Sequence, residues 1–313
     1  MLAVVQQTIS VTAPVFSMLF LGVVLKRLGL VDVAFINTAS TLVFRGTLPT
    51  LLFLGIIKAD LSAALQPALL LYFVLATLGC FLLAWAWSVW RCPKADRGIY
   101  TQGAFRGNNG IVGLALATSI YGDYGLSVGA VLGGVVILSY NILSAIILAI
   151  YSPQAKADVW SVGKSIVSNP LIIGVLAAIP FAAWQIPLPA WLLTSAGYFA
   201  QMSLPLALIC IGATLTLDSL RQGTGMAISS SLMKVLWLPV LATLGAGLCG
   251  FRGADLGILF LYFVSPTAAA SFVMAKAVGG NYQLASAIIV ISTLASVITT
   301  NLGLLLLQWV GWL

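Results

Sequence analysis

The sequence contains no histidine and no glutamate, and its acidic residues are seven aspartates. The lack of imidazole excludes Ser-His and Cys-His nucleophilic catalysis, His-ligated zinc and histidine proton relays. The four cysteines occur singly, without a CxxC pair: Cys80, Cys92, Cys210 and Cys249. Cysteines in apolar runs usually pack as small hydrophobic residues. We therefore expect no enzyme activity, no cofactor and no metal cluster.

Charge is also scarce. Only 7% of the 313 residues are charged, whereas 61% are hydrophobic. A soluble domain typically has about 25% charged and about 45–50% apolar residues. A water-soluble fold of this length has too little interior to bury so much apolar surface. The composition predicts a polytopic protein of the lipid bilayer, and the N-terminus shows no cleavable signal peptide.

Ten stretches are apolar enough to cross a bilayer, which takes about 20 residues of helix. We predict an all-α fold with transmembrane helices over residues 8–25, 34–57, 64–90, 99–119, 125–150, 166–183, 190–216, 225–249, 256–276 and 283–308. The longest polar connection, residues 151–165, separates a first five-helix repeat (1–150) from a second (166–313).

The basic residues predict the orientation of these helices. Loops after odd-numbered spans hold nine of the 14 Lys and Arg, and loops after even-numbered spans hold two. Cytoplasmic loops carry excess Lys and Arg, so we place residues 151–165 in the cytoplasm and both termini outside it, in the inner (plasma) membrane. The net charge of +7 then reflects topology, and we expect no nucleic acid partner. Three cations fall inside spans, and we expect Arg45 and Lys234 to snorkel or pair with carbonyls, while Arg106 is considered below.

The two halves share landmarks in the same order. At offsets of 156 to 159 residues, the matches are Pro14 with Pro170, Leu48-Pro49 with Leu204-Pro205, Asp96 with Asp255, and Gly122-Asp123-Tyr124 with Gly280-Asn281-Tyr282. Because each repeat has five spans, an odd number, the two copies must be inverted in the membrane. Inverted repeats are typical of secondary transporters, which bind their substrate near the midplane between broken helices.

Spans four and nine occupy the same position in the two repeats, and both contain helix-breaking residues near their middle. The runs are Gly107-Asn108-Asn109-Gly110 and Ser265-Pro266-Thr267. Interrupted backbone at membrane depth is tolerated where it lines a cavity or packs in protein. The N-termini of the resulting half helices carry partial positive charge and attract anions.

Arg106 lies beside the break in span four. A cation near the bilayer centre is costly, and an intramembrane arginine is a functional candidate by default. No aspartate lies well inside a span. Arg106 therefore either attracts an anionic ligand, by direct contact or through a neighbouring residue, or hydrogen bonds to carbonyls and stabilises the break. Asn108 and Asn109 offer amide donors and acceptors to a carboxylate or a coupling ion, and capping of the half helix is an equal alternative.

The run from Gln102 to Leu114, QGAFRGNNGIVGL, resembles the span-four signature of the auxin efflux carrier family. Similar segments are Tyr140-Asn141, Asn169-Pro170-Leu171, Ile211-Gly212-Ala213-Thr214-Leu215 and Ser265-Pro266-Thr267-Ala268. The resemblance covers nearly the whole chain. By residue, Asn108 or Asn109 and Pro266 match the family pattern, although plant members have a proline where this chain has Gly107 and the asparagine pair.

The resemblance implies the ten-helix fold shared with bile-acid:sodium symporters, in which helices 4 and 9 cross. Helices 1, 2, 6 and 7 (8–57 and 166–216) would form a scaffold that often forms a homodimer. Helices 3–5 and 8–10 (64–150 and 225–308) would form a transport domain. Plant members export auxin, a carboxylate, so the resemblance implies a small organic anion as substrate.

We therefore expect a secondary transporter, an efflux carrier of small organic anions that works by elevator-type alternating access around the crossing. The expected substrate-binding residues are Arg106, Asn108, Asn109, Pro266 and Thr267. The expected helix-break residues are Gly107, Gly110, Ser265 and Pro266. A sodium ion bound near Asn109, and therefore a sodium-coupled symporter, is an alternative. A passive channel or a receptor is the other alternative, whereas an intramembrane enzyme lacks its catalytic groups.

Overall fold

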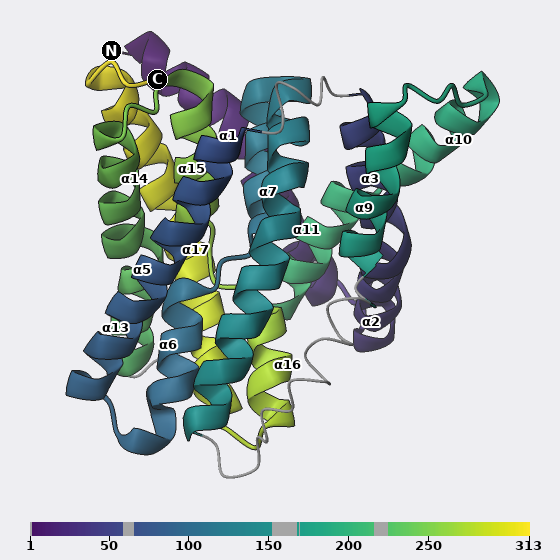
Figure 1. Ribbon diagram of the computed structural model, residues 1–313. Helices are drawn as coiled ribbons and strands as arrows, with labels where there is room; N and C mark the ends of the chain where they lie inside the picture. The colour runs from purple at the N-terminus through teal and green to yellow at the C-terminus, as the bar shows by residue number, and fades with distance from the viewer. Residues whose placement is uncertain (1, 59–65, 152–167, 169, 216–224) are drawn as a thin grey trace.

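The computed structural model describes residues 2–58, 66–151, 168, 170–215 and 225–313, and this part of the chain is built of helices without a strand (Figure 1). The helices are α1 (Leu2–Arg27), α2 (Val33–Leu42), η1 (Val43–Thr47), α3 (Leu48–Lys58), α5 (Pro67–Arg91), η2 (Lys94–Asp96), α6 (Arg97–Phe105), η3 (Asn109–Gly113), α7 (Leu114–Tyr151), α9 (Pro170–Ala183), α10 (Ala190–Gln201), α11 (Ser203–Thr214), α13 (Gly225–Leu232), η4 (Met233–Trp237), α14 (Leu238–Leu248), α15 (Gly253–Val264), α16 (Ala270–Ala277) and α17 (Tyr282–Trp309). Here η2 is a 3₁₀-helix, and η1, η3 and η4 are π-helical turns. Asn169 and nearly all of the predicted loop 151–165 lie outside the described residues.

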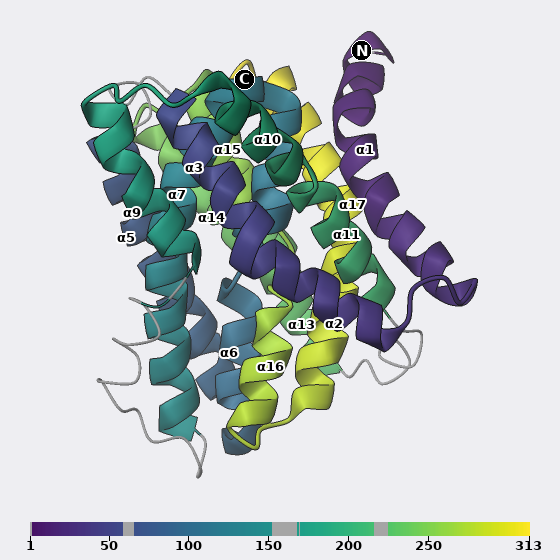
Figure 2. The ribbon, with the colours of Figure 1, turned by 90° about the vertical axis from the view of Figure 1, so that its right-hand side faces the viewer.

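Within the described residues, six apolar helical stretches are long enough to cross a membrane: Val33–Ile57, Pro67–Arg91, Asn109–Tyr151, Ala190–Thr214, Gly225–Leu248 and Tyr282–Trp309. Two shorter apolar helices are α9 and α15. Most helices stand side by side, and both termini lie at the same end of the bundle (Figures 1 and 2). The prediction of a multi-pass, all-helical membrane protein is thereby confirmed.

The stretch Asn109–Tyr151 reverses direction within α7. Gly122 has φ 58° and ψ −136°, a conformation that glycine adopts without a Cβ penalty. A Cβ on Gly125 would stand 2.1 Å from the carbonyl oxygen of Ala117, eight residues earlier in the chain. The segments 114–121 and 123–151 therefore fold back on each other, in agreement with the predicted gap between residues 119 and 125.

Prolines coincide with irregular turns in three further helices. The π-turns η1 and η4 directly precede the helices that begin Leu48-Pro49 and Leu238-Pro239. Predicted span seven is divided into α10 and α11 at Met202, three residues before Pro205. Proline lacks an amide donor and crowds the preceding turn, which explains why the helix widens or breaks there.

Glycines allow two close helix contacts. A Cβ on Gly22 of α1 would stand 2.1 Å from a carbonyl oxygen of α11, and a Cβ on Gly212 of α11 would stand 1.8 Å from one of α1. Gly174 of α9 likewise lies against the backbone of Pro49 in α3. Small residues of this kind let membrane helices approach closely. Predicted span one thus packs on span seven, and span two on span six.

Candidate functional site

The backbone is interrupted in both predicted broken helices. After α6 ends at Phe105, Arg106 is extended, with φ −81° and ψ 101°. After α15 ends at Val264, Ser265 is also extended, with φ −52° and ψ 136°. The helical path resumes at η3 on one side and at α16 on the other. Gly110 lies within the π-helical turn η3, directly after these extended residues and before the regular α-helix that begins at Leu114.

The two interruptions contact each other. Gly107 and Thr267 form an isolated antiparallel β-bridge. Its two hydrogen bonds run from the Asn108 amide to the Pro266 carbonyl, at 2.7 Å, and from the Ala268 amide to the Arg106 carbonyl, at 3.0 Å. These bonds satisfy backbone groups that two broken helices would otherwise leave unpaired in the interior. We call this pairing the crossing.

The crossing requires glycine at position 107. A Cβ there would stand 2.1 Å from Asn109 Oδ1 and 3.2 Å from Lys234 Cε. Such a contact forces the asparagine side chain or the backbone to shift. Glycine at position 107 therefore allows the side chains of Asn109 and Lys234 to lie close to the backbone of the crossing.

Thr267 and Ser265 use their polar groups inside the protein. The Thr267 hydroxyl donates to the Gly103 carbonyl at 2.7 Å, and its amide donates to Ser292 Oγ at 3.1 Å. The Ser265 hydroxyl donates to the Leu261 carbonyl at 2.7 Å. Thr267 therefore connects the crossing to α6 and α17, and Ser265 is hydrogen bonded to the last turn of α15.

The guanidinium group of Arg106 is buried against α7, with 8% of the residue exposed. Its three hydrogen bonds go to the Tyr140 carbonyl at 3.2 Å, Ser144 Oγ at 3.0 Å and Asn141 Oδ1 at 2.9 Å. All three acceptors are neutral, and Arg106 Nε has no partner among the described residues. Arg106 thus braces the break while its positive charge stays beside the crossing.

The two asparagines face different surroundings. Asn109 is 1% exposed, and its Nδ2 donates to the Tyr140 hydroxyl at 3.2 Å. Asn108 is partly exposed, and its carbonyl accepts the Val112 amide at 2.9 Å, which starts the half helix. Of the pair, Asn108 is therefore the side chain that a ligand can reach.

Two half-helix N-termini border the exposed side of the crossing. In η3 the first amide hydrogen bond given by the structure is that of Ile111, and in α16 it is that of Ser271. The earlier amides of a helix have no carbonyl within it and attract negative charge. Gly110 and Ala269, at these two starts, are partly exposed. Arg106 and the two N-termini each contribute positive charge at the crossing.

The amino-acid sequence that forms this site is similar to known proteins. The chain matches the model of a family described as membrane transport protein over residues 8–303. The chain belongs to the membrane transport protein family. The match covers nearly the whole chain and confirms the resemblance to auxin efflux carriers. The chain is thus a membrane transporter and not an enzyme.

Two archaeal relatives also match this transporter. An uncharacterized transporter of Methanothermobacter thermautotrophicus is 26% identical over 294 residues, which cover 92% of this chain and 94% of the relative. An uncharacterized transporter of Methanocaldococcus jannaschii is 26% identical over 214 residues, which cover 66% and 65% of the two chains. Both names agree with a transport function.

The transporter places a second cation at the crossing, which the sequence did not indicate. Lys234 in η4 is 2% exposed, and its Nζ donates to the Phe263 carbonyl at 2.6 Å. Pairing with a carbonyl, one of the two expected outcomes, is therefore confirmed for Lys234, and snorkelling is wrong. Arg45, by contrast, is exposed. Since Lys234 and Phe263 lie on different helices, only the tertiary fold reveals their contact.

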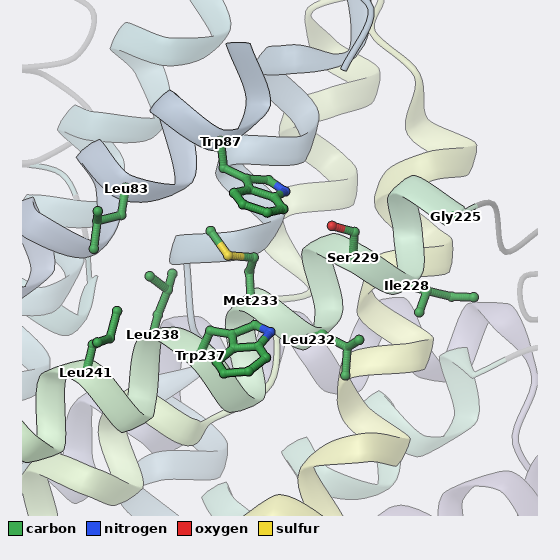
Figure 3. Close-up of a pocket in the computed structure, with 10 residues that line it drawn as sticks. All are labelled: Leu83, Trp87, Gly225, Ile228, Ser229, Leu232, Met233, Trp237, Leu238 and Leu241. Carbon is green, nitrogen blue, oxygen red and sulfur yellow. The ribbon is translucent and has the colours of Figure 1, made fainter. Parts of the chain in front are cut away.

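The transporter also has an apolar groove between α5 and the helices α13, η4 and α14 (Figure 3). It encloses about 500 Å³ and is lined by Leu83, Trp87, Gly225, Ile228, Ser229, Leu232, Met233, Trp237, Leu238 and Leu241. The Ser229 hydroxyl is hydrogen bonded to the Tyr100 hydroxyl at 2.7 Å. None of the predicted binding residues lines this groove, and it offers no cation to a carboxylate.

Proposed function

We propose that this membrane transport protein is a secondary transporter that exports small organic anions such as carboxylates. The observation that carries the proposal is the crossing, where two half-helix N-termini and the Arg106 cation meet without a described carboxylate. Such a site suits an anion. The membrane potential would drive a monovalent anion out of the cell with about 2.3 kcal/mol per 100 mV, so efflux needs no coupling ion.

In this proposal the carboxylate binds on the exposed side of the crossing. Asn108 contacts it through the side-chain amide, together with the first amides of η3 and α16. Arg106 acts on the anion through its charge, because the hydrogen bonds of its two terminal nitrogens go to α7. Asn109, Pro266 and Thr267 shape the site, since Thr267 and Asn109 are bonded within the protein.

We further propose that the helices form ten spans in two inverted repeats. Two links between the halves support this arrangement. Asn281 Nδ2 donates to Asp96 Oδ1 at 3.0 Å, and the Tyr124 hydroxyl donates to Asp255 Oδ1 at 2.5 Å. Each aspartate stands at the start of one broken helix, and each partner lies in the turn before the last helix of the other half. The bridge between Gly107 and Thr267, 160 residues apart, has nearly the repeat offset of 156 to 159.

We propose an elevator-type movement of the transport domain against the scaffold. In support, the side-chain bonds at the crossing join helices of the proposed transport domain to one another: α6, η3, α7, η4, α15 and α17. A unit that holds its own polar network together can move without breaking it. The proposed scaffold helices α2, α3, α9 and α10 lie together on the other side of the bundle (Figure 1).

The orientation and the homodimer are also proposals. α1 runs from the end of the bundle that holds both termini toward the other end (Figure 2), and its last turn contains Lys26 and Arg27. Arg91, at the end of α5, and Lys276, in the last turn of α16, are basic helix ends as well. An excess of positive charge marks the cytoplasmic side, which would place both termini outside the cytoplasm. Exposed aromatic residues on α10, such as Trp191 and Tyr198, suit contact with lipid or a second scaffold.

The test uses purified transporter reconstituted into liposomes. Liposomes loaded with an unlabelled carboxylate, from a panel of mono- and dicarboxylates, are diluted into the labelled compound. We expect saturable uptake by exchange between the two pools, with and without sodium. Uptake that needs sodium would favour the symporter, and flux without exchange or saturation would favour a channel. Failure to move any carboxylate under any gradient would overturn the proposal.

A further inference from the structure

A buried ammonium group stands at the crossing and has no part in the proposed contact with the anion. The Lys234 Nζ donates to the Phe263 carbonyl at 2.6 Å, and the residue is 2% exposed. A charge in an apolar interior is costly unless it is paired or hydrogen bonded. Among the described residues, the hydrogen-bond acceptor of this group is the neutral Phe263 carbonyl, and the structure gives it no carboxylate partner.

The carbonyl that it binds belongs to a broken helix end. Phe263 is in the last turn of α15, where carbonyls have no amide partner within the helix and form the negative end of its dipole. The amide four residues later, on Thr267, donates to Ser292 Oγ instead. In transporters with discontinuous helices, unwound carbonyls and half-helix C-termini coordinate the coupling sodium ion or proton.

A second oxygen atom borders the same space. Asn109 Oδ1 is buried and has no hydrogen-bond partner in the described part of the chain. Both this oxygen and Lys234 Cε lie within 3.2 Å of the point where a Cβ on Gly107 would stand. An unpaired amide oxygen, a helix-end carbonyl and an ammonium group thus gather on one side of the crossing.

We propose that the Lys234 ammonium is a built-in monovalent cation of the crossing. It occupies the place of a coupling sodium ion, and it makes the crossing independent of sodium. Removal of the side chain would leave the Phe263 carbonyl and Asn109 Oδ1 as ligands for a small cation. The consequence for transport, that anion movement needs no sodium, rests on the proposed function, whereas the cation site itself is tested by stability alone.

The experiment measures the thermal unfolding of purified protein in sodium, lithium or choline chloride at equal ionic strength. We expect the wild-type midpoint to be the same in all three salts. Lys234→Ala should unfold at lower temperature in choline and recover by about 2–4 °C in sodium, as expected for roughly 1 kcal/mol of binding. Lys234→Met should be destabilised without recovery, because its side chain still fills the space. Arg45→Ala is the matched control, since Arg45 is an exposed cation in the π-turn before Pro49.

Equal responses of Lys234→Ala and Lys234→Met to sodium would overturn the proposal, and so would a wild-type protein that sodium stabilises over choline. If Lys234→Ala does not fold in any salt, the wild-type measurement decides, and an indifferent wild type supports the proposal. Failure of the liposome assay with all carboxylates, combined with the expected unfolding results, would reject the proposed function and leave the built-in cation in place.

Discussion

The amide of Asn108 donates a hydrogen bond to the carbonyl of Pro266 at 2.7 Å and so joins two helix breaks that lie 158 residues apart in the chain. The bond fixes where the half helices η3 and α16 begin, and therefore where their free amides point. Neither break provides this geometry alone, because each leaves backbone groups that only the other one satisfies. The anion site that we propose is thus a product of the pairing.

Asn108→Ala is expected to weaken carboxylate binding while sparing the fold. The side chain is partly exposed, and the structure gives it no hydrogen bond to another described residue. Loss of one hydrogen bond to the ligand, about 1 kcal/mol, corresponds to roughly a fivefold higher Kd. Calorimetric titration with a carboxylate that the transporter moves measures this change. Asn108→Asp should weaken binding further by repulsion, and unchanged affinity in both variants would remove Asn108 from the site.

Gly107→Ala is expected to destabilise the crossing by about 1–3 kcal/mol, because the new Cβ would stand 2.1 Å from Asn109 Oδ1. Gly110→Ala is the matched control. It lies three residues further on, and a Cβ there meets nothing within 4 Å. Thermal unfolding of both variants in detergent should show a lower midpoint for position 107 alone. Equal midpoints would mean that the backbone at the crossing adapts freely.

Both breaks were predictable from the sequence, and the side-chain roles around them were not. The run Gly107-Asn108-Asn109-Gly110 and Pro266 disfavour a helix locally, so the residue types at these positions were enough to locate the interruptions. The position of Gly110 inside η3 depends on which amides the crossing engages, and the sequence does not contain that information locally. The same reason explains why the neutral acceptors of Arg106 on α7, 34 to 38 residues later, came only from the fold.

Arg106→Gln is expected to lower both the stability and the affinity for the anion. Glutamine cannot keep the three hydrogen bonds to α7, and it removes the positive charge behind the site. Ser144→Ala is the control, because it removes one of the bonds and leaves the charge. We expect Ser144→Ala to reduce the unfolding midpoint with little change in Kd. Arg106→Gln with wild-type affinity would show that Arg106 is a structural brace only.

The links of the two aspartates to the opposite repeat predict energetic coupling at each end of the molecule. The Tyr124 hydroxyl donates to Asp255, and Asn281 donates to Asp96. A double-mutant cycle of Tyr124→Phe with Asp255→Ala should give a coupling of about 0.5–3 kcal/mol, because each single variant already breaks the same bond. Asn281→Ala with Asp96→Ala should behave alike.

The control for these cycles combines residues from different links. Tyr124→Phe with Asp96→Ala changes one partner of each pair, so their effects on the unfolding free energy should add. Coupling within both links and additivity between them would support the inverted repeats, since equivalent aspartates would then secure equivalent half helices. Additivity within either link would mean that this hydrogen bond does not hold its broken helix to the other half, and the symmetry argument would lose that support.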